Sequence, residues 1–225
     1  MLIDLEGIDG SGKGTQARRL CDRFTQSGVS AALVSFPRYE ATLFGRAVGD
    51  FLNGRFGSLN QVHPFLVSLL FAGDRFESKQ YLLEAIARHE VVVLDRYVPS
   101  NVAHQASKLD GALRTELAAR ILDIEFDIFG LPRPDLVLLL DLPVSMAQQL
   151  IAKKSARQYT DRKADIQEAD ANYLGRVREV YHELAAAEPN WQVIACCDSE
   201  RLRTVDEIHQ LIWSVAVHGA TRTRP

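Results

Sequence analysis

The chain has 225 residues, of which 47% are hydrophobic and 24% charged, and this ordinary globular composition excludes a disordered, collagen-like or disulfide-rich protein. With 26 Lys and Arg residues against 29 Asp and Glu residues, the formal net charge is −3, which lacks the basic surplus typical of nucleic-acid-binding proteins. The three cysteines and six histidines show no metal-ligand spacing, and no apolar stretch is long enough for a membrane span. We therefore expect a soluble cytoplasmic protein whose partners include neither a nucleic-acid polymer nor a membrane.

Short apolar runs alternate with longer segments of helical periodicity, a pattern typical of β-α-β units around a parallel sheet. The predicted strands are Leu2–Glu6, Ala31–Phe36, Val91–Asp95, Leu136–Asp141 and Gln192–Cys196. The predicted helices are Lys13–Ser27, Thr42–Asn53, Val62–Arg88, Leu113–Phe129, Val144–Lys153, Asp165–Ala187 and Leu202–Val217. The third and fourth strands are almost continuously apolar, so we expect helices on both faces of the sheet. The sequence predicts an α/β fold with a five-stranded parallel sheet in one domain over residues 1–217, followed by a frayed tail at 218–225.

A glycine-rich segment joins the first predicted strand to the first predicted helix. It consists of Gly7, Ile8, Asp9, Gly10, Ser11, Gly12, Lys13, Gly14 and Thr15. This segment meets the phosphate-loop pattern G-x-x-x-x-G-K-[ST], except that Gly14 replaces the Ser or Thr. Glycines let successive backbone N–H groups converge on phosphate oxygens, and Lys13 would reach the β and γ phosphates. We therefore predict that residues 7–15 bind the phosphates of a nucleotide.

Further charged residues follow the other predicted strands, at the edge where an open parallel sheet binds ligands. Arg38 follows the second strand, and Asp95 and Arg96 end the third. Two carboxylates are candidate metal ligands at this edge, because Asp141 also ends an apolar run. We prefer Asp95, since Arg96 beside it gives that position a phosphate-facing partner, and we expect Asp141 to be structural.

The order and spacing of these motifs resemble those of the thymidylate kinase family. The motifs are Gly7–Thr15, Phe36–Tyr39, Phe71–Arg75 and Asp95–Asn101, with Pro134 and Asp135 and the helix Asp165–Tyr181. The resemblance spans nearly the whole chain and implies a P-loop kinase fold. It also implies transfer of the γ-phosphoryl group of ATP to dTMP, giving dTDP and ADP for dTTP synthesis, with Mg²⁺ as the cofactor and a homodimer as the assembly.

The resemblance also implies roles for single residues. Lys13, Asp9 and Arg96 would be catalytic, and Asp9 would contact the sugar 3′-hydroxyl. Asp95 and Asp9 would be the metal ligands; whether Asp95 or Thr15 contacts the magnesium ion directly is left open. The implied substrate-binding residues are Asp9, Phe36, Arg38, Phe71, Arg75, Arg96, Ser100, Asn101, Gln105 and Glu168.

Among these, Arg38 and Arg96 would bind the acceptor phosphate, because a guanidinium fork matches phosphate oxygens. Arg75 would hydrogen-bond the thymine edge while Phe71 stacks on its face. His104 stands where some family members carry an aromatic residue beside the sugar, so the choice between deoxyribose and ribose is left open.

Residues 153–163 carry five basic side chains and one acidic one. Composition alone favours a solvated helix end, where cations are stabilised. Some family members carry an arginine in the phosphate loop, where this chain has Gly10. The resemblance therefore implies that residues 153–163 form a short basic lid, with Arg157 and Arg162 as its catalytic arginines.

Three other classes of nucleotide-binding protein share part of this pattern. The pair Gly14 and Thr15 after Lys13 also occurs in adenylate kinases, so a different nucleoside monophosphate kinase, of the adenylate or UMP/CMP type, is the main rival. A deoxynucleoside kinase fits less well, because Arg38 and Arg96 imply an acceptor that already carries phosphate. A nucleotide-dependent switch protein would need no acceptor site at all.

Overall fold

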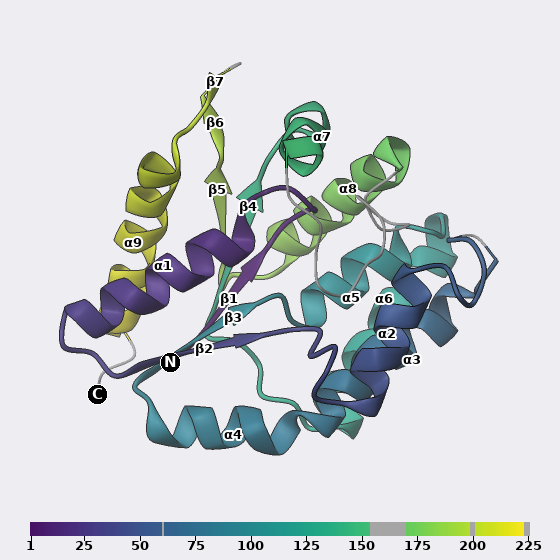
Figure 1. Ribbon diagram of the computed structural model, residues 1–225, viewed down its shortest axis with the longest axis horizontal. Coiled ribbons are helices and arrows are strands. Elements are labelled where there is room, and N and C mark those ends of the chain that lie inside the picture. Colours follow the sequence, from purple (N-terminus) through teal and green to yellow (C-terminus); the bar gives the residue numbers. More distant parts are fainter. Residues whose placement is uncertain (60, 154–169, 199–200, 223–225) are drawn as a thin grey trace.

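A computed structural model describes residues 1–59, 61–153, 170–198 and 201–222. Its centre is a parallel sheet of five strands in the order β2-β3-β1-β4-β5 (Figure 1). The strands are β1 (Leu2–Glu6), β2 (Ala31–Ser35), β3 (Val91–Asp95), β4 (Leu136–Asp141) and β5 (Trp191–Ala195). The order reverses at β1, which lies between β3 and β4. Ligands of open α/β sheets bind at such a reversal, beyond the carboxyl ends of the strands.

Helices cover both faces of this sheet, as the sequence predicts. They are α1 (Lys13–Gln26), α2 (Leu43–Leu52), α3 (Pro64–Glu77), α4 (Lys79–Arg88), α5 (Val98–Ala106), α6 (Gly111–Leu122), the π-helix η1 (Asp123–Ile128), α7 (Val144–Lys153), α8 (Ala171–Ala187) and α9 (Val205–Arg222). Helices α1 and α9 lie on one side, and α5 and α8 lie on the other (Figure 1). A short hairpin of β6 (Cys197–Asp198) and β7 (Arg201–Leu202) follows β5. The predicted α/β class, five parallel strands and two helical layers are confirmed.

The sequence analysis did not predict helix α5, and the reason is its burial. All nine of its residues are buried, including four polar ones, Ser100, Asn101, His104 and Gln105. Val98, Val102 and Ala106 recur at helical spacing, but the segment is short and buried polar residues lie between them, so the pattern does not stand out as an apolar stripe. This unpredicted helix carries four polar residues of the cavity that lies at the carboxyl ends of the strands.

Two predicted helices are each divided in the structure. The predicted helix Val62–Arg88 is two helices, α3 and α4, which meet at Ser78; apolar spacing does not reveal such a junction. The predicted helix Leu113–Phe129 changes at Leu122 from α6 to the π-helix η1. Such π segments are frequent at functional sites, and this one brings the fully buried Glu125 into the interior.

Helix α9 begins later than predicted and extends past the predicted end at Val217. The side-chain oxygen of Thr204 accepts a hydrogen bond from the N–H of Glu207 (3.2 Å), and the carboxylate of Glu207 accepts one from the N–H of Thr204 (2.7 Å). This capping box fixes the start at Val205 rather than Leu202. None of the described helices combines the length and the apolar composition needed to cross a membrane.

Candidate active site

The loop between β1 and α1 has the backbone geometry of a phosphate-binding loop. Gly7, Gly10 and Gly12 have φ values of 140°, 87° and 89°, which favour glycine. A Cβ atom at Gly10 would lie 2.6 Å from the carbonyl oxygen of Ala147 in α7, so the loop packs backbone to backbone. Helix α1 begins directly after the loop, with no acidic residue in its first turn. The positive end of the helix dipole therefore lies at the loop, where it favours an anion.

Lys13 is held within this loop. Its Nζ donates to the carbonyl oxygen of Ile8 (2.8 Å) and lies 3.5 Å from the hydroxyl of Ser11, and the side chain is buried. Burial, together with the nearby Arg96 guanidinium, lowers the pKa of Lys13 to about 7. An amine in these surroundings gains its charge when an anion arrives, as expected of a phosphate-binding lysine.

The departure of Gly14 from the phosphate-loop pattern has a structural reason. A Cβ atom at this position would lie 2.9 Å from Oδ2 of Asp95. The absence of a side chain at Gly14 therefore permits the carboxylate at the end of β3 to approach the first turn of α1. Thr15, the next hydroxyl residue, is exposed in that turn.

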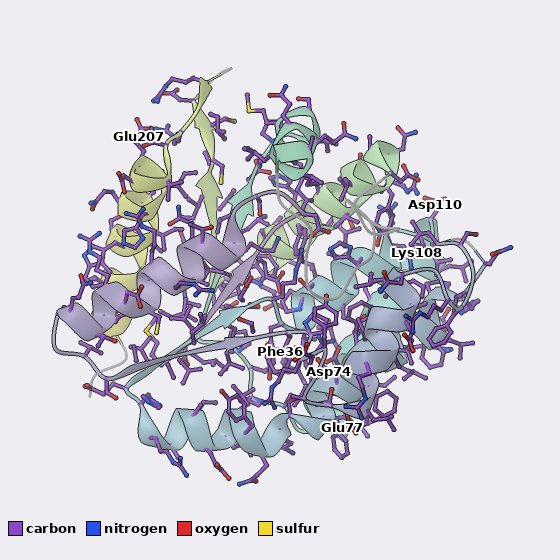
Figure 2. All side chains as sticks on the ribbon, viewed as in Figure 1. Phe36, Asp74, Glu77, Lys108, Asp110 and Glu207 are labelled. Atoms are coloured by element: carbon purple, nitrogen blue, oxygen red, sulfur yellow. The ribbon has the colours of Figure 1, made fainter. Side chains whose placement is uncertain are left out.

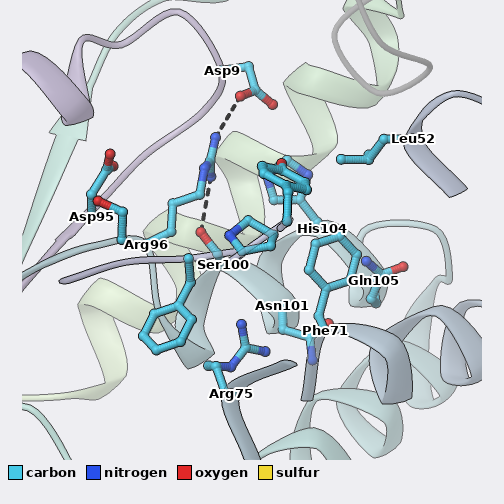
Figure 3. A pocket seen from close by; sticks show the side chains of 14 residues that line it. Asp9, Leu52, Phe71, Arg75, Asp95, Arg96, Ser100, Asn101, His104 and Gln105 are labelled. Atoms are coloured by element: carbon cyan, nitrogen blue, oxygen red, sulfur yellow. Dashed lines mark hydrogen bonds and ion pairs between the residues drawn. The ribbon is translucent and has the colours of Figure 1, made fainter. Parts of the chain in front are cut away.

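A cavity lies beside the loop, at the carboxyl ends of β1, β2 and β3, with an empty volume of about 860 Å³ (Figure 3). Its lining residues are Asp9, Ser35, Phe36, Pro37, Tyr39, Leu52, Phe71, Arg75, Asp95, Arg96, Ser100, Asn101, His104 and Gln105. The structure thus brings together every described residue of the predicted substrate-binding set except Arg38. Aromatic and aliphatic walls with a few convergent polar groups are typical of a small-molecule site.

Arg96 lies between the glycine loop and α5. Its guanidinium donates to Oδ1 of Asp9 (2.6 Å) and to the hydroxyl of Ser100 (3.0 Å), as Figure 3 shows. Its backbone has a φ of 70°, an uncommon value for a non-glycine residue that marks local strain. The strained backbone and the two side-chain partners together hold the guanidinium at the cavity wall.

Glu6 organises this wall from below, and the sequence analysis did not assign it a role. The carboxylate is fully buried at the end of β1 and accepts hydrogen bonds from the N–H groups of Tyr97 (2.8 Å) and Ser100 (3.0 Å). It also accepts from the hydroxyls of Ser100 (2.6 Å) and Tyr181 (2.7 Å). Glu6 therefore fixes the first turn of α5, and with it the residue that holds Arg96. An acidic residue within an apolar strand was the signal that could have identified it.

Arg75 and Asn101 form a second polar group at the cavity wall. The guanidinium of Arg75 donates from Nε and Nη2 to the two carboxylate oxygens of Glu125 (2.7 Å for Nη2). Asn101 donates to Glu125 (2.8 Å) and to the carbonyl oxygen of Ser68 (3.0 Å), whereas its own Oδ1 is buried without a hydrogen-bond partner among the described residues. A buried unpaired oxygen beside a cavity suits a ligand that donates a hydrogen bond. The sequence analysis missed Glu125, because its inward position depends on the π-helix.

His104 stands on the same wall as a neutral imidazole. Its ring Nδ1 lies 3.0 Å from the hydroxyl of Tyr173, which also donates to the carbonyl oxygen of His104 (2.9 Å). Burial lowers the pKa of His104 to about 3, with Arg96 the next contributor. The residue is therefore uncharged at neutral pH.

Two further strand-end residues engage partners outside the cavity. The guanidinium of Arg38 donates to the hydroxyl of Ser78 (3.3 Å) and lies 4.1 Å from the ring centroid of Tyr81, so Arg38 does not line the cavity as observed. Asp141 accepts from Nε (2.7 Å) and Nη2 (2.8 Å) of Arg178 and contacts His182 (3.0 Å). These ion pairs give Asp141 a structural role.

Three residues of the predicted site, Arg157, Arg162 and Glu168, lie outside the described residues, as does the segment 154–163 of the predicted lid. Within the described ranges no three His, Cys, Asp or Glu side chains form a ready metal site. Mg²⁺ usually takes only one or two carboxylates and completes its shell with phosphates and water, so the carboxylates of Asp95 and Asp9 at the loop suit that ion.

A glycine loop at the start of α1, beside a polar cavity at the reversal of a parallel sheet, defines the P-loop kinase fold and the class of nucleotide-binding phosphotransferases. Comparisons with known proteins identify the family. The sequence model of the family described as thymidylate kinase matches residues 5–210. By this match the chain belongs to the thymidylate kinase family.

Individual relatives agree with this assignment. The chain is 36% identical to a thymidylate kinase of Mycobacterium tuberculosis over 83% of this chain and 86% of that protein. It is 33% identical to a probable thymidylate kinase of Thermococcus onnurineus, over 97% of this chain and 98% of that protein. Among solved structures, a thymidylate kinase from Candida albicans superposes with a TM-score of 0.72 at 23% identity, covering 97% of this chain and 92% of that one. This last similarity supports the fold.

Proposed function

We propose that this protein transfers the γ-phosphoryl group of ATP to dTMP, giving ADP and dTDP. The observation that carries the proposal is the pairing of two adjacent sites: a phosphate loop at β1 and α1, and a separate cavity with Arg96, Arg75 and Asn101 on its walls. A nucleotide-dependent switch protein needs only the first site. An enzyme that transfers a phosphoryl group from one nucleotide to another needs both.

In this mechanism the loop amides and Lys13 bind the β and γ phosphates of ATP. The acceptor phosphate is already anionic, so no general base is required. Arg96 binds that phosphate from the opposite side, and Arg38 joins it when its side chain turns from Tyr81 toward the cavity. Catalysis then consists of alignment and charge stabilisation.

Mg²⁺, when bound, supplies positive charge between the phosphates, and Asp95 and Asp9 are the residues that would hold it. Arg157 and Arg162 supply further charge to the transferring group from the basic lid. Glu168 binds near the acceptor sugar.

The base is selected by Arg75 and Asn101 at the polar end of the cavity, with Phe71 against its face. Arg75 donates to a base oxygen, and the unpaired Oδ1 of Asn101 accepts from a ring N–H. This donor and acceptor pair complements the edge of thymine or uracil, and Phe36, Ser100 and Gln105 enclose the rest of the acceptor.

We also propose a homodimer and a cytoplasmic location. Helix α2 packs on α3, and α3 packs on α6, and their outer sides expose Leu43, Leu66 and Leu113 to 64%, 57% and 61%. A second copy of the chain would cover these side chains. All three cysteines are free thiols, as expected in a reducing compartment. Light scattering after size exclusion tests the dimer, and Leu66→Glu should then yield a monomer.

The deciding experiment measures ADP release by the full chain with dTMP, dUMP, AMP, CMP and UMP in parallel, with Lys13→Met as the inactive control. A preference for dTMP supports the proposal. A preference for AMP, CMP or UMP would assign a different nucleoside monophosphate kinase. ADP release that is independent of every acceptor would favour the switch.

A further inference from the structure

Lys108, in the turn that follows α5, contacts a residue of the cavity wall. It lies next to helices α2 and α5 (Figure 2). Its Nζ donates to Oε1 of Gln105 over 2.8 Å. The same ammonium lies 5.3 Å from the ring centroid of Phe51 and 6.0 Å from that of Tyr173. Two aromatic faces and one hydrogen bond therefore hold the lysine head in place.

This contact fixes the orientation of the Gln105 side-chain amide. A lysine ammonium carries three donors and no acceptor, so the amide oxygen, and not the nitrogen, has to face it. The nitrogen is then turned to the other side. In Figure 3 the Gln105 nitrogen points toward the side of Phe71, with the oxygen directed away from it.

The amide nitrogen of Gln105 finds no acceptor in the part of the chain that the structure describes. Gln105 is fully buried, it lines the cavity, and its Nε2 has no hydrogen-bond partner among the described residues. A buried donor without a partner is costly, and it is common where a ligand completes the set.

We propose that Lys108 is a positioning residue, which sets the Gln105 amide so that its N–H group donates to an acceptor oxygen of the bound nucleotide. The inference rests on the proposed function for the identity of that nucleotide, dTMP. Both a base carbonyl and the sugar 3′-hydroxyl offer an acceptor oxygen. Without Lys108 the amide can rotate by half a turn and oppose the same oxygen with its own, so the polarity of the wall is lost.

The test is a double-mutant cycle on dTMP affinity, measured by calorimetry with wild type, Lys108→Met, Gln105→Met and the double variant. Methionine keeps the unbranched stem of the lysine and its packing between the two rings. Burial lowers the pKa of Lys108 to about 7, so the titrations are made at about pH 6, where the ammonium form predominates. We expect each single variant to bind dTMP about 3- to 10-fold more weakly, and the double variant to bind like Gln105→Met alone.

Two controls separate positioning from general packing. Lys108→Arg keeps a head group that only donates, and should retain affinity within about twofold. Lys79→Met removes another lysine that donates to a carbonyl oxygen, that of Phe129 at 2.7 Å, but outside the cavity, and should leave dTMP affinity unchanged. Repeating the cycle with 3′-deoxythymidine monophosphate identifies the acceptor: coupling that disappears assigns the sugar hydroxyl, and coupling that persists assigns a base carbonyl.

Independent losses overturn the inference. If Lys108→Met weakens binding by the same factor with Gln105 and in the Gln105→Met background, the lysine acts independently of the Gln105 amide. If Lys108→Met binds dTMP like wild type, the lysine has no part in binding. A wild-type protein that binds no dTMP would instead overturn the proposed function, and this inference with it.

Discussion

The structure predicts a large loss of stability for Glu125→Gln. The carboxylate is fully buried in η1, and it accepts two hydrogen bonds from Arg75 and one from Asn101. The neutral amide would leave the guanidinium of Arg75, itself only 2% exposed, as an uncompensated buried charge. Removing one partner of a buried ion pair costs about 3–5 kcal/mol of unfolding free energy. For a chain of this length that lowers the melting temperature by about 6–20 °C.

Thermal unfolding of the full chain, followed by calorimetry, measures this loss. The matched control is Glu116→Gln, since its ion pair with Arg120 joins side chains that are more than half exposed, and it should cost under about 1 kcal/mol. Replacing both partners, with Arg75→Met and Glu125→Leu together, should restore much of the stability, because no unpaired charge is left. It should not restore dTMP binding. A Glu125→Gln protein that melts within about 2 °C of wild type would refute the reasoning, because that margin corresponds to under about 1 kcal/mol.

Three further predictions concern the loop and the lid. Burial lowers the pKa of Lys13 to about 7, and a bound phosphate should restore its charge, so ATP binding above that pH should take up a proton. Calorimetry in two buffers of different ionisation heat measures this uptake. Lys13→Met should abolish both the uptake and turnover, and a wild-type protein without uptake would contradict the lowered pKa. Gly14→Ala places a Cβ atom 2.9 Å from the Asp95 carboxylate, so kcat should fall about tenfold with the fold intact by circular dichroism, and an unchanged kcat would mean that the close approach is dispensable. Replacing both Arg157 and Arg162 with Met should lower kcat by at least about 10²-fold with little change in dTMP affinity, whereas a solvated helix end predicts no loss beyond about twofold.

The central strands of the sheet could be predicted because strands that are buried on both faces, such as β3 and β4, have nearly continuous apolar sequences. Three strands, Leu2–Glu6, Val91–Asp95 and Leu136–Asp141, match their predicted bounds. Strand β2 ends one residue earlier than predicted, and β5 is shifted by one residue at both ends. The phosphate loop could also be predicted, because its glycines occupy backbone conformations that few other residues permit.

What could not be predicted depends on buried polar contacts. Helix α5 is short, and its buried polar residues interrupt the apolar positions, so its helical spacing is easily missed in the sequence. Glu6 and Glu125 act through partners that are distant in the chain, such as Tyr181 and Arg75. A local sequence pattern does not reveal those partners. Arg38 was assigned from its position at a strand end, but the direction of its side chain depends on Tyr81 in α4.

The contact between Gly10 and Ala147 has a mechanical consequence. A Cβ atom at Gly10 would lie 2.6 Å from the carbonyl oxygen of Ala147 and 3.1 Å from Cγ1 of Ile151, so the phosphate loop packs closely against both the main chain and a side chain of α7. Helix α7 ends at Lys153, directly before the basic segment. The loop that would receive the phosphate is therefore in direct contact with the helix that leads to the basic segment. Any side chain at position 10 would clash with Ala147, so the loop and α7 would have to move apart even without a nucleotide.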